Sequence, residues 1–249
     1  MPRYILEVAY RGTNYSGFQI QQNANSIQAE VEKAFQILQR QKITLTGSSR
    51  TDAGVHALQN FFHFDLETDI TAKISYQLNA ILPDDIAIKR IMKSKPDAHC
   101  RFDALSREYK YYIYREKNPF LRDRAFYFPY KLNMEVMHEA AELLKRYQDF
   151  TSFSKRNTQV KTFVCDIMES KWVWEGDCLI FYVKANRFLR GMVRALVATM
   201  LKVGRQKMTV GNFRELIEAK DCAKTNFAVP AHGLFLIAVN YPEKYLVGQ

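Results

Sequence analysis

Cysteine is scarce in this sequence, and its distribution excludes two kinds of site. Only four cysteines occur among 249 residues, and none forms a C-x-x-C pair. That pattern argues against a structural zinc site and against a disulfide framework. We therefore expect no metal, and the scarcity of cysteine favours a reducing compartment, the cytoplasm.

Long hydrophobic runs are also missing. The apolar run Ala195–Leu201 is far too short to cross a bilayer. The first ten residues, MPRYILEVAY, lack both an extended apolar region and a small-residue cleavage site, so neither export nor a membrane partner is expected. Since 47% of the residues are hydrophobic and 25% are charged, the composition is that of a globular chain and excludes wholesale disorder.

Acidic residues are too few to balance the basic ones. The chain carries 36 Lys and Arg against 26 Asp and Glu, a net charge of +10. Residues 1–103 have a net charge of only +1, and residues 104–249 have +9. This excess predicts a polyanionic partner, most commonly a nucleic acid, bound mainly by the second half. A basic face that only keeps the protein in solution would give the same count.

Hydrophobic periodicity divides the chain into two halves with the same order of elements. Each half, 1–103 and 104–249, predicts the order βαββαβ, the ferredoxin-like arrangement, with one extra helix in the second half. We expect an α+β fold in which two antiparallel sheets join side by side and leave a central basic cleft. The expected elements are strands 3–10, 43–46, 58–66, 86–92, 108–114, 163–174, 179–184 and 234–239, and helices from 26, from 71, 134–147, 187–203 and 210–219.

One loop of the first half carries most of the chemistry-bearing residues. Gly47-Ser-Ser-Arg-Thr-Asp-Ala-Gly-Val-His56 lies between two predicted strands and is far longer than a hairpin needs. We expect Gly47 and Gly54 to allow positive φ angles, so that the loop folds tightly and fixes Asp52. Alternatively, Asp52 caps a turn through its own backbone.

Residues 50–56, RTDAGVH, and five other segments together resemble the tRNA pseudouridine synthase A family. The other segments occur in the family's order along the chain: residues 10–12, 15–19, 107–111, 149–153 and 185–194. Three positions depart from the family pattern without removing a reactive group: Phe18, Ser49 and Ala195 stand where tryptophan, glycine and asparagine are usual.

The resemblance implies a reaction and a set of roles. The family breaks the N-glycosidic bond of a uridine, turns the base and rejoins it through C5, which requires no cofactor and no metal. Asp52 is then the catalytic carboxylate, whether it attacks C1′, adds to the pyrimidine ring or takes the C2′ proton. Arg194 is its cationic neighbour, Tyr109 lies against the target base, and Arg50 helps to hold the uridine out of its stack.

Other side chains are expected to have RNA-binding or purely structural roles. Arg187, Arg190 and Arg194 recur at helical spacing, so we expect them on one helix face, contacting phosphates or forming only a solvated polar face. We expect the basic segment 152–161 to be a mobile loop that closes over RNA. Gln19, in the family motif at 15–19, is also expected to bind RNA. The expected RNA-binding residues are Gln19, Lys155, Arg156, Lys161, Arg187 and Arg190. His56 and Tyr111 are expected to be structural.

The sequence therefore predicts a cytoplasmic isomerase. By resemblance, its substrates are uridines 38, 39 and 40 of the tRNA anticodon stem-loop, in the tRNA's own numbering, and it acts as a homodimer. Two other functions fit the same residues: a non-catalytic RNA-binding protein of the same fold, and a synthase with a different RNA target.

Overall fold

The chain folds into two compact units. The computed structural model describes residues 1–67, 70–71, 73–156, 160–225, 229–243 and 245. Unit 1 comprises residues 1–105 and 236–249, and unit 2 comprises residues 106–235. The described residues form nine strands, mostly antiparallel, and five α-helices, which agrees with the expected α+β class.

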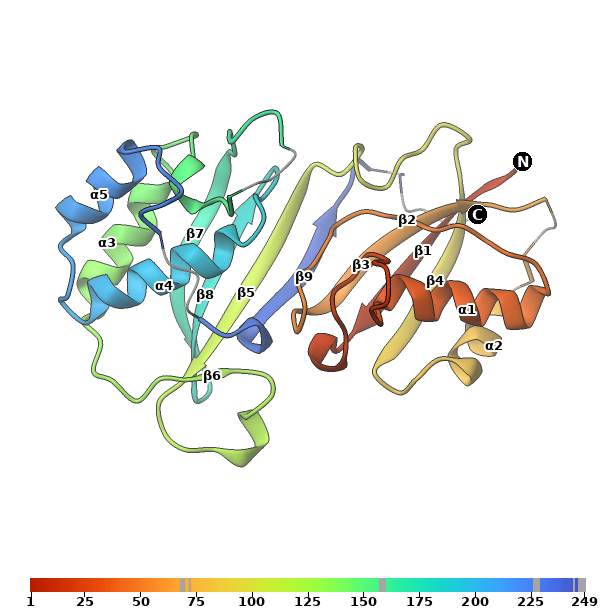
Figure 1. Ribbon diagram of the computed structural model, residues 1–249, viewed down its shortest axis with the longest axis horizontal. Coiled ribbons are helices and arrows are strands. Elements are labelled where there is room, and N and C mark those ends of the chain that lie inside the picture. The colour runs from red at the N-terminus through yellow and green to blue at the C-terminus, as the bar shows by residue number, and fades with distance from the viewer. Residues whose placement is uncertain (68–69, 72, 157–159, 226–228, 244, 246–249) are drawn as a thin grey trace. The chain divides into compact units, whose positions relative to one another are not determined.

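Unit 1 is built on an antiparallel sheet with the order β4-β1-β3. These strands are β1 (Arg3–Tyr10), β3 (His56–Asp65) and β4 (Ile86–Ser94), and the two-residue strand β2 (Thr46–Gly47) pairs with β3. Helices α1 (Ile27–Gln39) and α2 (Ile74–Ile81) lie next to each other (Figure 1). Within residues 1–105 the order of strands and α-helices is the expected βαββαβ, although β2 is shorter and later than the strand expected at 43–46.

Local sequence explains where α1 begins and which face it buries. Ser26 has an extended backbone, and its hydroxyl accepts a hydrogen bond from the Ala29 amide at 3.2 Å, as the sequence predicts for an N-cap. The apolar positions at helical spacing, Ile27, Val31 and Phe35, are fully buried. The helix ends at Arg40, whose backbone is left-handed.

Unit 2 is built on the antiparallel order β5-β8-β7. Strands β7 and β8 form the expected hairpin, with Gly176 at φ +56° in its turn. Helices α3, α4 and α5 pack against one another, and α3 also contacts β7 (Figure 1). The bounds are β5 (Ser106–Tyr114), β6 (Phe126–Tyr127), α3 (Met134–Leu144), β7 (Ile167–Glu175), β8 (Cys178–Ala185), α4 (Met192–Gly204) and α5 (Val210–Glu218). Strand β9 (Leu234–Asn240) belongs mostly to unit 1, whose second stretch begins at Leu236.

The start of helix α4 corrects one expectation. The helix begins at Met192, not near Arg187, because Gly191 precedes it with a left-handed backbone at φ +74°. Arg187 and Arg190 therefore lie in the segment before the helix, and only Arg194 is in its first turn. The three arginines therefore do not share a helix face, and of the three only Arg194 carries a charge that opposes the helix dipole.

None of the helices in the described part of the chain has the length and apolar character needed to span a bilayer.

Candidate active site

The loop of residues 47–56, here called the Asp52 loop, is held by the segment that follows β1. Asp52 forms an isolated antiparallel bridge with Gly17, and the Phe18 amide donates to the Thr51 carbonyl at 3.1 Å. The Gly54 amide donates to the Tyr15 carbonyl at 3.3 Å. Within the loop, the Val55 amide donates to the Asp52 carbonyl at 3.2 Å. These bonds fix the backbone on both sides of Asp52, whose own side chain is only half-buried.

A buried network of hydrogen bonds joins the Asp52 loop to strands β1 and β3 of the sheet. The Tyr10 hydroxyl and the Thr51 hydroxyl are 2.8 Å apart, next to Asp52 in sequence. The side-chain amide of Asn60, fully buried on β3, donates to the Ser49 carbonyl at 2.8 Å and to the Tyr10 hydroxyl at 3.2 Å. The network thus ties the loop to β1 and β3, and satisfied buried networks of this kind rigidify their surroundings.

Glycine is required at this site for two different reasons. Gly54 has a positive φ of +77°, as expected for a tight loop. Gly47 lies on β2 and is required for space, because a Cβ there would come within 2.4 Å of the Phe18 ring. A Cβ added at Gly12 would come even closer to the backbone of Val55. The Gly12 amide donates to Nδ1 of buried His56 at 3.2 Å. His56 therefore has the structural contact that the sequence predicted.

We expect the Tyr10→Phe variant to lower the free energy of unfolding by about 1–2 kcal/mol, because it removes a buried hydroxyl shared by Thr51 and Asn60. Urea denaturation measures the change. Tyr76→Phe is the matched control, since Tyr76 is 78% exposed and its loss of a hydroxyl should change stability by less than about 0.5 kcal/mol. Equal effects of the two variants would show that the network does not stabilise the loop.

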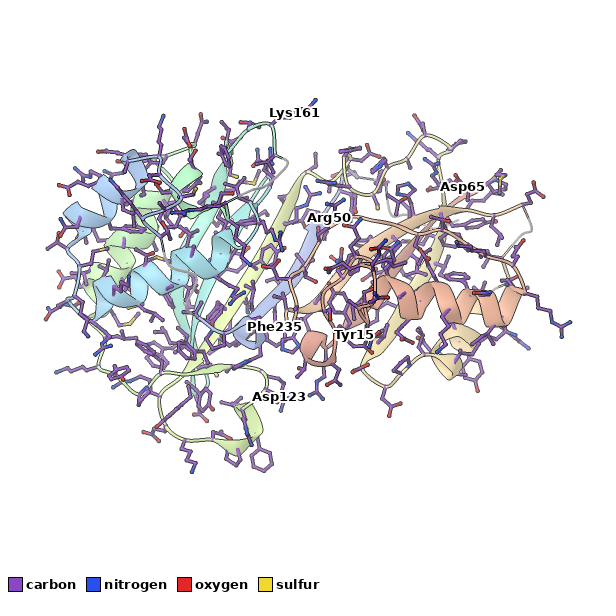
Figure 2. The ribbon with its side chains drawn as sticks, viewed as in Figure 1. Tyr15, Arg50, Asp65, Asp123, Lys161 and Phe235 are labelled. Atoms are coloured by element: carbon purple, nitrogen blue, oxygen red, sulfur yellow. The ribbon has the colours of Figure 1, made fainter. Side chains whose placement is uncertain are left out.

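The expected substrate-binding residue Arg50 and the expected RNA-binding residue Gln19 lie together in unit 1. Arg50 and Gln19 are both exposed, and both line one pocket beside the loop (Figure 2 labels Arg50). Arg50 is therefore placed on the solvent side of the loop while its neighbour Thr51 is buried against Tyr10. An exposed guanidinium two residues before Asp52 in the sequence suits contact with an anionic substrate.

In unit 2, Tyr109 and Tyr111 lie on β5 and differ in their surroundings. Tyr111 is fully buried and its hydroxyl donates to the Pro230 carbonyl at 2.8 Å, so it is the core aromatic that the sequence predicted. Burial raises the pKa of Tyr111 and keeps its hydroxyl protonated. Tyr109 is 8% exposed and contacts Phe188 edge to face, with ring centroids 5.0 Å apart.

The guanidinium of Arg194 is oriented by the backbone. Its Nε and Nη2 donate to the Val229 carbonyl at 3.0 and 2.8 Å. This two-point contact fixes the plane of the guanidinium. Arg194 is half-buried, so its charge lies in a partly desolvated setting where electrostatic contacts are stronger than in water.

The remaining basic residues of unit 2 lie mostly at the surface. The Lys155 amide donates to the Arg190 carbonyl at 3.2 Å, which brings those two segments together. Arg156, Lys161 and Arg190 are exposed, and Arg187 is half-buried. Residues 157–159 of the expected basic loop lie outside the described residues.

The titratable groups offer neither a metal site nor a thiol nucleophile at these positions. Within the described ranges, no group of three or more His, Cys, Asp or Glu side chains could hold a metal ion. Burial raises the pKa of the Cys165 thiol to about 11, so this cysteine, in the electrostatic field of Arg187, is a thiol at neutral pH.

Comparison with known proteins decides the family. The sequence profile of the tRNA pseudouridine synthase family matches residues 7–103 and 140–242. The chain belongs to this family. Tyr109 lies between the two matched stretches, whereas Arg50, Asp52 and Arg194 lie within them.

Full-length relatives agree with the family profile. The chain is 47% identical to the tRNA pseudouridine synthase A of Parabacteroides distasonis over 246 residues, 98% of each chain. It is 47% identical to that of Bacteroides thetaiotaomicron, over 98% of this chain and 92% of the relative, and 35% identical to that of Staphylococcus aureus, over 98% and 94%. The expected family and the expected class, an isomerase acting on tRNA, are thereby confirmed.

The sequence did not predict which residues support the Asp52 loop. Asn60 is one of several polar residues of β3, and no pattern in the sequence distinguishes it as the partner of Ser49. Tyr10 was part of a recognised motif, but its bond to Thr51 depends on how β1 pairs with β3. A partnership between residues about 40 positions apart becomes visible only once the register is known.

Proposed function

We propose that this protein converts uridine to pseudouridine at positions 38, 39 and 40 of the tRNA anticodon stem-loop, with Asp52 as the catalytic carboxylate. The supporting observation is the fixed backbone around Asp52, held by Gly17, Phe18 and Tyr15 in a chain of the tRNA pseudouridine synthase family. A catalytic group must be placed precisely to act on a sugar or a base, and a loop with these contacts provides that placement.

The chemistry balances without an added reactant. The bond between N1 and C1′ of the uridine breaks, a bond between C5 and C1′ forms, and the C5 hydrogen is released as N1 gains a proton. Asp52 takes part at the sugar or the base, in one of the three ways left open above. No redox partner is required for these steps.

Three further residues are proposed to bind the flipped uridine. Arg50 is exposed beside Asp52 and suits contact with the displaced nucleotide. Tyr109 supplies an aromatic ring for stacking on the uracil and is a candidate to relay the C5 proton. Arg194, with its guanidinium plane fixed by Val229, is proposed as the cationic neighbour of the catalytic carboxylate.

The proposal extends to the rest of the RNA-binding surface and to the fold. Each half is proposed to be ferredoxin-like, which the order β4-β1-β3 with β2 beside β3 supports for the first half. We also propose the catalytic half 1–103, the RNA-binding half 104–249, the basic cleft, the homodimer and a cytoplasmic location, where tRNA is modified. The proposed phosphate contacts are Gln19, Lys155, Arg156, Lys161, Arg187 and Arg190.

Tritium release tests the reaction and its target together. A tRNA transcript labelled with 5-[³H]uridine, carrying uridine at position 39 and cytidine at positions 38 and 40, should release tritium with the protein. The matched transcript with cytidine at all three positions should release none, because only isomerisation frees the C5 hydrogen. Equal release from both transcripts would indicate a different RNA target. Tight binding of tRNA with no release would indicate a non-catalytic RNA-binding protein.

A further inference from the structure

A small pocket of unit 1 opens beside the Asp52 loop. Its volume is about 180 Å³, and its lining includes Phe18, Arg50, His99, Arg101 and Phe102. Two arginines and a histidine contribute to the lining, and no carboxylate does. Such a lining favours an anionic ligand that also presents a flat, aromatic or apolar surface.

The floor of the pocket is formed by Phe18, which is hydrogen-bonded to the Asp52 loop. Phe18 is 1% exposed and stacks on Phe62, with ring centroids 4.5 Å apart and planes at 12°. Gly47 allows this position, because any Cβ there would collide with the Phe18 ring. The Phe18 amide also donates to the Thr51 carbonyl, so the pocket floor and the backbone of Asp52 are held in one arrangement.

The rim of the pocket is an exposed aromatic platform. Phe102 is 74% exposed, and its ring lies 4.2 Å from that of His99, with the planes at 31°. The Arg101 guanidinium is 5.8 Å from the Phe102 ring centroid. Nδ1 of His99 accepts from the amides of Arg101 and Phe102 at 3.2 and 3.4 Å, and the His99 amide donates to Asp103 at 2.7 Å. The turn therefore presents Phe102 and Arg101 to solvent in a defined geometry.

We propose that this pocket binds the nucleotide next to the target uridine, with its phosphate at Arg50 and Arg101 and its base against Phe102. Unstacked RNA is recognised by aromatic and arginine side chains that stack on bases while cations contact the backbone. Arg50 precedes Asp52 by two residues, at most about 7 Å of chain, so a ligand at Arg50 lies close to a nucleotide reacting at Asp52. The inference rests on the proposed function, because it takes Asp52 as the reacting centre.

The size of the pocket agrees with this occupant. At about 180 Å³ it is smaller than the roughly 300–1,000 Å³ that pockets for whole small molecules offer. It accommodates one phosphate group and one edge of a base, and the rest of the nucleotide lies on the exposed Phe102 ring.

Binding of tRNA measured across a salt series tests the pocket with three variants. Arg101→Ala should lower the slope of log affinity against log salt by about one, because one phosphate contact is lost. Phe102→Ala should weaken binding about tenfold and leave the salt slope unchanged, because it removes stacking and no charge. Lys89→Ala is the matched control: Lys89 is an exposed cation on β4, outside the pocket lining, and its removal should change neither quantity.

Single-turnover tritium release at saturating protein completes the test. Lys89→Ala should keep the wild-type rate, because Lys89 lies outside the pocket lining, and Arg101→Lys should restore the salt slope that Arg101→Ala lowers. Binding of Arg101→Ala and Phe102→Ala that matches Lys89→Ala would overturn the pocket assignment. If the wild type releases no tritium, the proposed function fails, and the salt series still decides whether the pocket binds RNA.

Discussion

Asp52→Asn is expected to lower the rate of tritium release from tRNA by roughly 10⁴-fold or more, with the affinity for tRNA unchanged within about threefold. The amide has nearly the shape of the carboxylate but carries no charge, so it can neither attack a sugar carbon nor accept a proton. The backbone bonds of this loop come from Gly17, Phe18 and Tyr15 and do not involve the Asp52 side chain, so the loop should stay in place. Single-turnover release with saturating protein measures the chemical step.

Asp84→Asn is the control for this experiment. Asp84 is an exposed carboxylate of unit 1 that precedes β4, so its substitution makes the same change in charge away from the loop. We expect wild-type release from it. If Asp52→Asn retains more than a tenth of the wild-type rate, Asp52 is not the catalytic carboxylate, and the fixed loop serves another purpose.

The sequence predicted the strongly periodic elements well because their burial is a local matter. The strand expected at 3–10 is found at those residues, and Ser26 caps α1 as its side chain suggests. The start of α4 was predicted wrongly because the arginine spacing resembled a helix, while Gly191 adopts a left-handed backbone that breaks it. Strand β6 was missed, since two residues paired with β5 leave no periodic pattern.

The site residues stay predictions, and the contacts that support the Asp52 loop could not be predicted from the sequence. Residues 50–56 and their resemblance were enough to select Asp52, and the family match agrees with that resemblance. Tyr10, Asn60 and Gly12 add contacts to Thr51, Ser49 and His56 that join residues 11 to 44 positions apart, and no local pattern in the sequence marks these pairs. The pocket rim at Arg101 and Phe102 shows no pattern in the sequence, because its aromatic platform depends on the turn that His99 organises.

Gly12→Ala is expected to lower the free energy of unfolding by about 3 kcal/mol or more and to reduce tritium release strongly. A Cβ at this position would lie 2.0 Å from the Val55 carbonyl oxygen and 2.7 Å from its carbon. Both are backbone atoms, so the clash can be relieved only by moving the chain on one side. Movement of Val55 strains the loop three residues from Asp52, and movement of Gly12 breaks its bond to His56.

Gly211→Ala, the same substitution at another position, is expected to have the opposite effect on stability. Gly211 lies in helix α5, and the nearest atom to an added Cβ is the Thr209 hydroxyl oxygen at an ordinary 3.5 Å. Alanine should therefore raise stability there by about 0.5–1 kcal/mol and leave tritium release unchanged. Urea denaturation and single-turnover release measured on both variants separate the two effects. A Gly12→Ala protein with wild-type stability and activity would show that the close approach of Gly12 to Val55 does not hold the Asp52 loop.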